Sequence, residues 1–574
     1  MLKRIFVVLF ICALFVQCAR RGSPTGGPKD ETPPVLLRAE PAQETVNFKE
    51  DKIRIYFDEY IKLNQLREQL VISPPLDQST FIISPQSIAS KYINIEFMDS
   101  LAPNTTYTFN FGESIVDNNE GNPLSFFSYV FSTGSVIDSL TLNGRISDAL
   151  LRNPENFVSV MLYPIDSTFT DSVIFKNKPL YYTNTLDSLV DFIIPNLKAG
   201  QYLLGAVKDV SKNYVFDPSV DKIDVISNPI TLPNDSLFSL SLFKEEPDFA
   251  FGRAYQAGEQ RIGFGYKGSP DFEIVLDGEF PESFVSVVSQ DRETDTLYCW
   301  YKGFEADSLK FTLKHDTLTR SYEYRVRKAE PDTLMITFVQ SGTLDLTDTL
   351  KIRTNTPLQS YSSDAILLID KNSVEVPFKM AQYNKHELQL LFDIFPNEKY
   401  KLQLLPGAIT DFFDTINDTL DVQFSTKSRV DYGNLSLRLG NVPELPIFID
   451  ILDEKEEIKR SIYVTEPQGL YRFAYLQPNK YYIRVRIDEN TNGKWDTGNY
   501  LKKQKPEPVY HFESLLDVRA NWELQEQFIF KVKLSRSLKK GSLFRVLFKV
   551  SRSIIKLAVV SFSSIKISSS PKAL

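Results

Sequence analysis

The stretch from Leu476 to Asp496, LQPNKYYIRVRIDENTNGKWD, has a degenerate copy 279 residues earlier, LKAGQYLLGAVKDVSKNYVFD from Leu197 to Asp217. Aligned without a gap, the copies match at Leu197 and Leu476, Tyr202 and Tyr481, Asp209 and Asp488, Asn213 and Asn492, and Asp217 and Asp496. Each copy opens on an alternating apolar run, typical of a half-buried β-strand, and continues into a loop rich in Asp and Asn. The repeat indicates a chain built from successive modules.

Length and composition favour several β domains. The chain has 574 residues, which at about 100 to 200 residues per domain predicts three to five domains. Its 42 Phe and 27 Tyr, together with the rarity of stretches that have helical spacing, favour strands. We therefore predict an all-β fold of tandem β-sandwich domains.

The charge of the chain is divided unevenly. Residues 531–574 carry eleven Lys and Arg and no acidic residue, so the rest of the chain stands at −19 against a net −8 for the whole. Nucleic-acid binding needs basic surfaces, so the acidic part of the chain argues against a nucleic-acid partner. For the basic tail, an interfacial membrane helix and a frameshifted or disordered end stay open as alternatives, because its basic residues are only partly confined to one helical face.

The N-terminus has the pattern of an export signal. Lys3 and Arg4 precede the apolar run Ile5 to Val16, which is too short to span a bilayer and is followed by Cys18. The segment resembles a bacterial lipoprotein signal, which implies lipidation at Cys18 and a membrane partner. The alternative is an uncleaved anchor, or an ordinary signal with a chance cysteine. Basic residues follow Cys18 where surface-export signals are acidic, so we expect the periplasmic face of the outer membrane.

The first domain shows the clearest family resemblance. Its segments TPPVLLRAEP, IRIYFDEYI, LAPNTTYTF, VDNNEGNPL and VFST are short alternating strands with turn residues between them. They resemble the bacterial Ig-like domain of S-layer and other surface proteins. A poorer copy of the same landmarks, from LKIRTNTPLQ to VQFSTKS, follows later in the chain. The resemblance implies structural or binding modules.

The remaining strands complete a predicted order of domains. Segments such as VSVMLYPID and VDFIIPNLKAGQYLLGAVKD resemble the transthyretin-like or carboxypeptidase-regulatory-like sandwich. The full arrangement resembles a lipoprotein family of Bacteroidetes. The predicted order is a signal peptide at 1–17, a flexible tether at 18–31, Ig-like domain 1 at 32–135, transthyretin-like domain 1 at 138–245, an intervening β domain at 246–334, Ig-like domain 2 at 335–428, transthyretin-like domain 2 at 430–530 and a basic tail at 531–574.

One loop has the spacing of a ligand site. Asp488, Asn490, Asn492 and Asp496 place oxygen donors at positions one, three, five and nine of a calcium loop, with Gly493 at position six. Position twelve is Asn and not the bidentate Glu of such loops. In the earlier copy, the glycine position is a tyrosine, which we expect to resist a positive φ. Calcium is therefore one prediction, and a hairpin loop capped by its own Asp side chains is the alternative.

An aromatic strand offers a second candidate site. Tyr298 and Trp300 share one face of the segment LYCWYKG, and sugars stack on such rings, so a glycan site is predicted there, with a core face as the alternative. Cys299 lies on the opposite face and is expected to be a buried apolar thiol.

Catalytic patterns are weak. The three histidines, His315, His386 and His511, fall in different predicted domains and outside any nucleophile or zinc motif. The Gly263 to Gly268 run spells a dinucleotide fingerprint but leads into a turn and a strand where a helix is needed. We predict that the protein is not an enzyme and that, apart from the candidate calcium loop at Asp488, it has no cofactor. The expected function is a lipid-anchored envelope scaffold or spacer, with a binding module for an envelope partner or glycan as the alternative.

Overall fold

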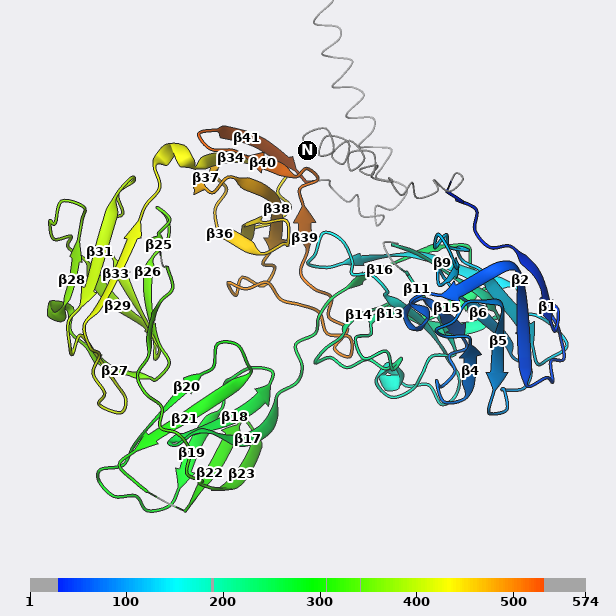
Figure 1. The fold of residues 1–574 in the computed structure, drawn as a ribbon, viewed down its shortest axis with the longest axis horizontal. Coiled ribbons are helices and arrows are strands. Elements are labelled where there is room, and N and C mark those ends of the chain that lie inside the picture. The colour runs from blue at the N-terminus through cyan, green and yellow to red at the C-terminus, as the bar shows by residue number, and fades with distance from the viewer. Residues whose placement is uncertain (1–28, 187–189, 306, 341, 531–574) are drawn as a thin grey trace, which may run out of the picture.

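The computed structural model describes residues 29–186, 190–305, 307–340 and 342–530. In this part of the chain, strands dominate, so the all-β prediction is confirmed. The strands group into five successive sandwiches, which we call units 1 to 5 (Figure 1): 36–132, 140–242, 250–325, 336–425 and 433–529. Cys18, the predicted signal peptide and the tail 531–574 lie outside the described residues.

Unit 1 packs two antiparallel sheets around an aromatic core. One sheet has the order β1-β2-β5-β4, with β7 on β2, and the other β3-β6-β8. The bounds are β1 (Leu36–Glu40), β2 (Lys52–Leu63), α2 (Leu66–Gln69), β3 (Val71–Ser73), β4 (Phe81–Ser84), β5 (Ser90–Phe97), β6 (Thr106–Asn110), β7 (Ile115–Asp117) and β8 (Ser128–Ser132). In β2, Ile53, Ile55 and Phe57 alternate inward, as a period of two requires.

Units 2 and 5 share one topology. In unit 2 the sheets are β11-β10-β13-β14, with β15 on β13, and β12-β9-β16. Its bounds are β9 (Leu140–Asp148), β10 (Ser159–Pro164), η1 (Asp171–Phe175), β11 (Tyr181–Asn184), β12 (Asp191–Leu197), β13 (Gly200–Lys208), β14 (Lys222–Val225), β15 (Ile230–Leu232) and β16 (Leu237–Leu242).

Unit 5 repeats this arrangement as β36-β35-β38-β39, with β40 on β38, and β37-β34-β41. Its bounds are β34 (Gly433–Gly440), β35 (Ile447–Leu452), β36 (Ile458–Val464), β37 (Tyr471–Leu476), β38 (Asn479–Ile487), β39 (Val509–His511), β40 (Leu516–Val518) and β41 (Glu523–Ile529). The first and last strands pair in parallel in both units, β9 with β16 and β34 with β41. The sequence repeat covers equivalent strands, β13 and β38, and the loops that follow them.

Units 3 and 4 are sandwiches of their own. Unit 3 has sheets β17-β18-β21-β20 and β19-β22-β23, and unit 4 has β24-β26-β30-β29, β25-β33-β31-β28 and the pair β27-β32. The unit 3 bounds are β17 (Ala250–Gly258), β18 (Arg261–Lys267), β19 (Glu273–Asp277), β20 (Val285–Gln290), β21 (Thr296–Lys302), β22 (Ser308–His315) and β23 (Leu318–Arg325). The unit 4 bounds are β24 (Ile336–Phe338), β25 (Gly342–Thr343), β26 (Leu350–Thr354), β27 (Leu358–Tyr361), η2 (Ser363–Ala365), β28 (Ile366–Ile369), β29 (Lys379–Asn384), β30 (Glu387–Leu391), β31 (Lys399–Leu404), β32 (Ile409–Asp411) and β33 (Leu420–Ser425), followed by η3 (Arg429–Asp431) before unit 5.

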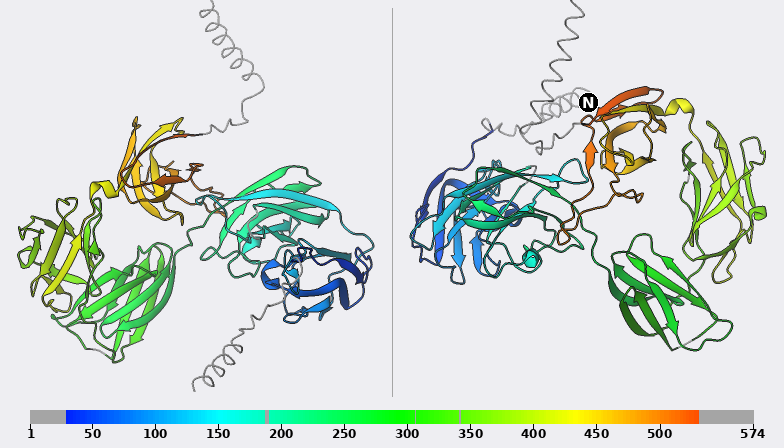
Figure 2. Two further views of the ribbon diagram at one scale, coloured as in Figure 1. Left: turned by 45° about the horizontal axis from the view of Figure 1, so that its top comes forward. Right: turned by 180° about the vertical axis from the view of Figure 1, so that it is seen from behind.

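The chain turns back on itself. Units 2, 3, 4 and 5 follow one another around an open centre, and unit 5 returns to touch unit 2, with unit 1 packed on the outer side of unit 2 (Figures 1 and 2). Within the described residues, no helix combines the length and the hydrophobicity that a membrane span needs.

Candidate functional site

The two repeated loops are built on equivalent carboxylates. After β13, Asp209 accepts hydrogen bonds from the main-chain N–H groups of Asn213 (3.2 Å) and Tyr214 (2.7 Å). After β38, Asp488 accepts from those of Asn492 (3.1 Å) and Gly493 (2.9 Å). The equivalent donors stand four and five residues after the Asp in both copies. This is the pattern that the capped-hairpin alternative predicts.

A second carboxylate closes each loop. Asp221 accepts from the N–H groups of Val210 (2.9 Å) and Asp217 (2.9 Å). Glu507 accepts from those of Glu489 (2.7 Å) and Asp496 (2.8 Å), which are the same two positions of the repeat. Both carboxylates of each loop are buried, so their hydrogen bonds form away from competing water. Each loop is thus a rigid frame with two acidic braces.

The turn inside the frame also keeps its backbone shape. Lys212 and Thr491 have φ of 54° and 61°, and Tyr214 and Gly493 have φ of 64° and 78°. The expectation that Tyr214 resists a positive φ is therefore wrong. Its ring packs against Tyr182 at 4.9 Å between centroids, and this packing offsets the cost of about 1 to 2 kcal/mol of the left-handed conformation.

The four predicted calcium ligands lie together in the unit 5 loop. Asp488 is fully buried, and its second oxygen also accepts from the hydroxyl of Tyr463 at 2.7 Å. Asp496 accepts from the side-chain amides of Asn490 and Asn492. Among the described residues, no group of three or more His, Cys, Asp and Glu side chains is arranged to hold a metal ion. Calcium binding here stays a prediction.

The loops differ in length between the frame residues. Three residues separate Asp217 from Asp221, whereas ten separate Asp496 from Glu507. We call the ten residues 497–506 the arm. The arm leaves unit 5 and lies against unit 2 (Figure 1), where Tyr500 joins the cluster of buried side chains that includes Phe216 and Phe243. The insertion therefore joins two units that are distant in the chain.

Polar contacts and close packing hold the arm. Thr497 donates to the carbonyl of Lys244 at 2.5 Å, and the N–H of Tyr500 donates to the buried carboxylate of Glu245. The ammonium of Lys505 contacts Asp224 and also the carbonyl of Val225 at 3.1 Å.

Gly498 lies directly on the ring of Phe243. A Cβ atom at this position would stand 2.7 Å from that ring and 2.8 Å from the main-chain oxygen of Gln504, so only glycine fits without a shift of both neighbours. Glycine is therefore what allows the arm backbone to approach unit 2 so closely.

A second contact joins the same two units. The guanidinium of Arg152 in unit 2 donates to the carbonyls of Phe512 (2.5 Å) and Glu513 in unit 5, and lies over the ring of Tyr482 at 4.7 Å. From unit 5, Arg484 donates to Leu150 O at 3.2 Å while it pairs with the fully buried Asp450 at 3.0 Å. The interface is polar and specific.

His511 lies in this second contact. Burial, followed by the nearby Arg484 and Arg152, lowers the pKa of His511 to about 4, so the ring is neutral at pH 7. Its buried Nε2 has no hydrogen-bond partner among the described residues. The other two histidines have structural contacts: His315 stacks on Phe249 at 3.7 Å, and His386 bonds to the hydroxyl of Ser289 at 2.8 Å.

The predicted glycan face is covered. Tyr298 and Trp300 do share one face of β21, opposite Cys299. However, Trp300 is only 1% exposed, because His386 and Phe413 of unit 4 pack near its ring and its indole N–H donates to Ser289 at 2.8 Å. A sugar cannot stack on Trp300 in this arrangement, so the glycan prediction is wrong for this residue.

The other face of β21 behaves as the sequence predicts. Cys299 is buried and free, and burial raises its pKa to about 12. The glycine-rich run lies partly in β18, with Gly263 and Gly265 in the strand, so no helix N-terminus follows it. The nucleotide-binding pattern is thus a strand of unit 3.

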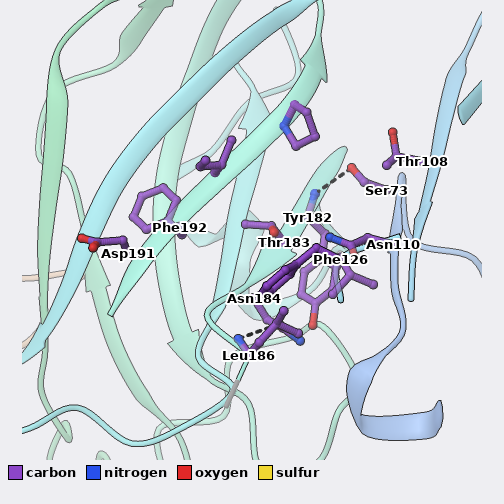
Figure 3. A pocket seen from close by; sticks show the side chains of 13 residues that line it. Ser73, Thr108, Asn110, Phe126, Tyr182, Thr183, Asn184, Leu186, Asp191 and Phe192 are labelled. Atoms are coloured by element: carbon purple, nitrogen blue, oxygen red, sulfur yellow. Dashed lines mark hydrogen bonds between the residues drawn. The ribbon is translucent and has the colours of Figure 1, made fainter. Parts of the chain in front are cut away.

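A cavity of about 300 Å³ lies where unit 1 meets unit 2 (Figure 3). Edge strands β3, β11 and β12 contribute to its wall, and β6 supplies Thr108 and Asn110. Most of its exposed lining surface is apolar, and amide or hydroxyl groups come from Ser73, Thr108, Asn110, Tyr182, Thr183 and Asn184. The size falls at the lower end of small-ligand pockets. Its lining residues come from distant parts of the chain, so no local motif marks it.

Comparisons with known proteins support the fold of unit 1. Residues 30–133 match the family described as the bacterial Ig-like domain, which confirms that resemblance for this part of the chain. No curated protein matches the chain. The lipoprotein and Bacteroidetes resemblances stay predictions.

Several solved structures are similar to the chain. Surface layer protein SbsC, domains 1-6, is 10% identical over 82% of this chain and 67% of that chain, with a TM-score of 0.13. Salmonella alpha-2-macroglobulin reacted with methylamine is 11% identical over 84% of this chain and 42% of that chain, with a TM-score of 0.14. Sidekick-1 immunoglobulin domains 1-5 are 8% identical over 69% of this chain and 81% of that chain, with a TM-score of 0.14. At these TM-scores, the likenesses carry no argument about function.

Proposed function

We propose that this protein is a non-enzymatic, lipid-anchored structural protein of the bacterial cell envelope. Its anchor is Cys18, its tether is the Gly- and Pro-rich segment 18–31, and its folded part is a scaffold of fixed shape. The observation that carries the proposal is the arm of unit 5 seated on unit 2.

The arm matters because tandem sandwiches are mobile by default. Interfaces between neighbouring domains are small, so a row of units bends at its linkers unless further contacts restrain it. Here the arm and the Arg152 contact connect unit 5 to unit 2 and close units 2 to 5 into one body. The Trp300 contact fixes unit 3 against unit 4 in the same way. Such a body holds its ends at set distances, which is what a spacer needs.

The anchor is tested separately from the scaffold. In a Gram-negative host, the full chain should fractionate with the outer membrane and shift in size with globomycin, which blocks removal of lipoprotein signals. Cys18→Ala should release the protein from the membrane without changing the melting temperature of units 1 to 5, because those units begin at residue 36. Equal membrane attachment of the variant, with no effect of globomycin, would contradict the anchor.

A binding role for an envelope partner is the second candidate. The cavity between units 1 and 2 favours it, because a concave apolar site with a few amide groups is typical of ligand sites. A crosslinking pull-down from intact cells distinguishes the two roles. A scaffold recovers stable neighbours that still crosslink after the cavity is altered, whereas a binding protein loses its partner.

A further inference from the structure

The cavity between units 1 and 2 is bordered by a strand edge that has no partner. In the sheet β12-β9-β16, β12 (Asp191–Leu197) is one of the two outer strands. Its pairing with β9 places Ile193 opposite Asn143 and Phe192 opposite Gly144. One face of the strand is core, since Phe192 and Ile194 are buried, while Ile193 is 60% exposed.

The backbone of Ile193 points away from its own sheet. Ile146 N–H donates to Val190 O at 2.7 Å, which makes these residues a hydrogen-bonded pair of the antiparallel ladder. Such pairs alternate, so Phe192 and Ile194 bond to β9, and the N–H and C=O groups of Asp191 and Ile193 face outward. Among the described residues, no strand pairs with this edge. An unpaired edge is a template for another strand.

The cavity beside this edge accepts an uncharged apolar group. Val71, Phe126, Leu186 and Ile193 are among its apolar lining residues, and Phe126 is 49% exposed at the surface (Figure 3). The one charged lining residue, Asp191, pairs with Arg145 at 2.8 Å. The side chain of Asn184 accepts from Leu186 N–H at 2.9 Å and also bonds to the Tyr182 hydroxyl. The side-chain carbonyl of Asn110 accepts from Gly112 N–H at 2.9 Å, which leaves the Asn110 NH₂ group to donate. Such side-chain amides suit the main chain of a peptide.

We propose that this site binds an extended, uncharged peptide segment of a partner protein by strand addition to β12. The main chain of the segment pairs with the outward groups of Asp191 and Ile193, and a Leu- or Phe-sized side chain enters the cavity. Strand addition of this kind takes affinity from main-chain hydrogen bonds and selectivity from a side-chain pocket. The inference goes beyond the proposed scaffold role, since the site would act whether or not Cys18 carries lipid.

The probes are short neutral peptides, acetyl-Thr-Thr-X-Thr-Thr-amide with X as Leu, Phe, Ala or Lys, titrated into the full chain and followed by amide NMR shifts. The Leu and Phe peptides should bind at least tenfold more tightly than the Ala and Lys peptides. In the Leu peptide, N-methylation should abolish binding at alternate residues only, because every second N–H faces β12. Absence of binding by the Leu and Phe peptides up to 5 mM would overturn the proposal.

Two substitutions of Ile193 distinguish main-chain pairing with the peptide from packing of the Ile193 side chain. Ile193→Pro removes the outward N–H without removing a bond to β9, so it should weaken Leu-peptide binding at least tenfold. Ile193→Ala keeps the main chain and should bind within about threefold of the parent. Melting curves check that both variants fold. Equal binding by the folded Pro variant, or equal loss at every N-methylated position, would contradict strand addition.

Discussion

The loop after β13 and the loop after β38 share one frame but serve different neighbours. Both use a first Asp and a second carboxylate, Asp221 or Glu507, that brace equivalent main-chain groups. In unit 2 the frame is closed by three residues, and the loop lies near unit 1, where Lys212 and Glu68 approach to 3.5 Å. In unit 5 the arm fills the same interval and reaches unit 2.

This difference indicates that the features that fold each unit are distinct from the features that hold the units together. The braces are common to both copies, so they account for the local fold. The arm is present in one copy and, together with the Arg152 contact, closes units 2 to 5. The comparison predicts that damage to a brace unfolds its own unit, and that damage to the arm opens the body while each unit stays folded.

Loss of a first brace should have the largest effect. Asp488→Ala removes the acceptor of two main-chain N–H groups and of the Tyr463 hydroxyl, and should cost unit 5 about 3 kcal/mol. Asp209→Ala, the matched variant, lacks the tyrosine contact and should cost about 1 kcal/mol less. Denaturant unfolding measures both. A neutral Asp488→Ala would contradict the frame.

The same variant tests calcium. If calcium binds, Asp488→Ala and Asp496→Ala should each lower the melting temperature by more with calcium than with a chelator, because a ligand of the native state stabilises it by mass action. The frame alone predicts that Asp488→Ala has the same effect with calcium and with a chelator.

Loss of the arm anchor should have the next largest effect. Tyr500→Ala removes a ring that stacks on Phe175 at 6.2 Å, and should weaken closure by about 2 to 3 kcal/mol. The radius of gyration from small-angle scattering should rise, while circular dichroism stays unchanged. Leu501→Ala is the control, because Leu501 is 52% exposed and should leave the radius unchanged.

Acid should open the body through His511. Its folded pKa of about 4 lies below the ordinary value of 6.5, so the unfolded or opened state binds a proton first as the pH falls. The free energy by which this contact stabilises the closed state is greatest above pH 6.5. It falls by about 2 kcal/mol between pH 6.5 and pH 4, after allowance for solvent screening. His511→Gln should reduce this decline in melting curves from pH 7 to 4. An unchanged pH profile would assign the acid sensitivity to other groups.

The turn glycine should matter least. Gly493 has φ of 78° and open space around its Cα, so Gly493→Ala meets only the backbone cost of about 1 kcal/mol. Tyr214 shows that a side chain is tolerated at the equivalent position when its ring is packed. A loss much above 2 kcal/mol would mean that the turn has contacts beyond the frame.

The sequence was sufficient for the parts of the fold that depend on local pattern. Alternating runs such as Ile483, Val485 and Ile487 predicted strands, and the repeat predicted equivalent loops. The buried state of Cys299 followed from its place in an apolar strand. The strand pattern, each copy of the repeat and the surroundings of Cys299 can all be recognised from residues that are close together in the sequence.

Local sequence patterns could not predict the contacts between residues of different units. Nothing near Trp300 shows that Phe413 and His386 lie over it, and nothing near Tyr500 shows that Phe175 is its neighbour. The positive φ of Tyr214 depends on packing with Tyr182 from another strand. One signal was available: the interval after Asp496 is seven residues longer than the interval after Asp217 before the second carboxylate, and an insertion in a repeated loop marks a site of added contacts.

Closure of unit 5 on unit 2 is most directly tested by zero-length carbodiimide crosslinking of the native chain, read by mass spectrometry. Lys503 of the arm and Asp171 of unit 2 lie 3.6 Å apart, and both side chains are more than half exposed. Lys212 and Glu68, 3.5 Å apart between units 2 and 1, supply the internal control. The closed arrangement predicts a Lys503–Asp171 crosslink within the monomer that Tyr500→Ala abolishes. Recovery of the control crosslink without Lys503–Asp171 would contradict closure.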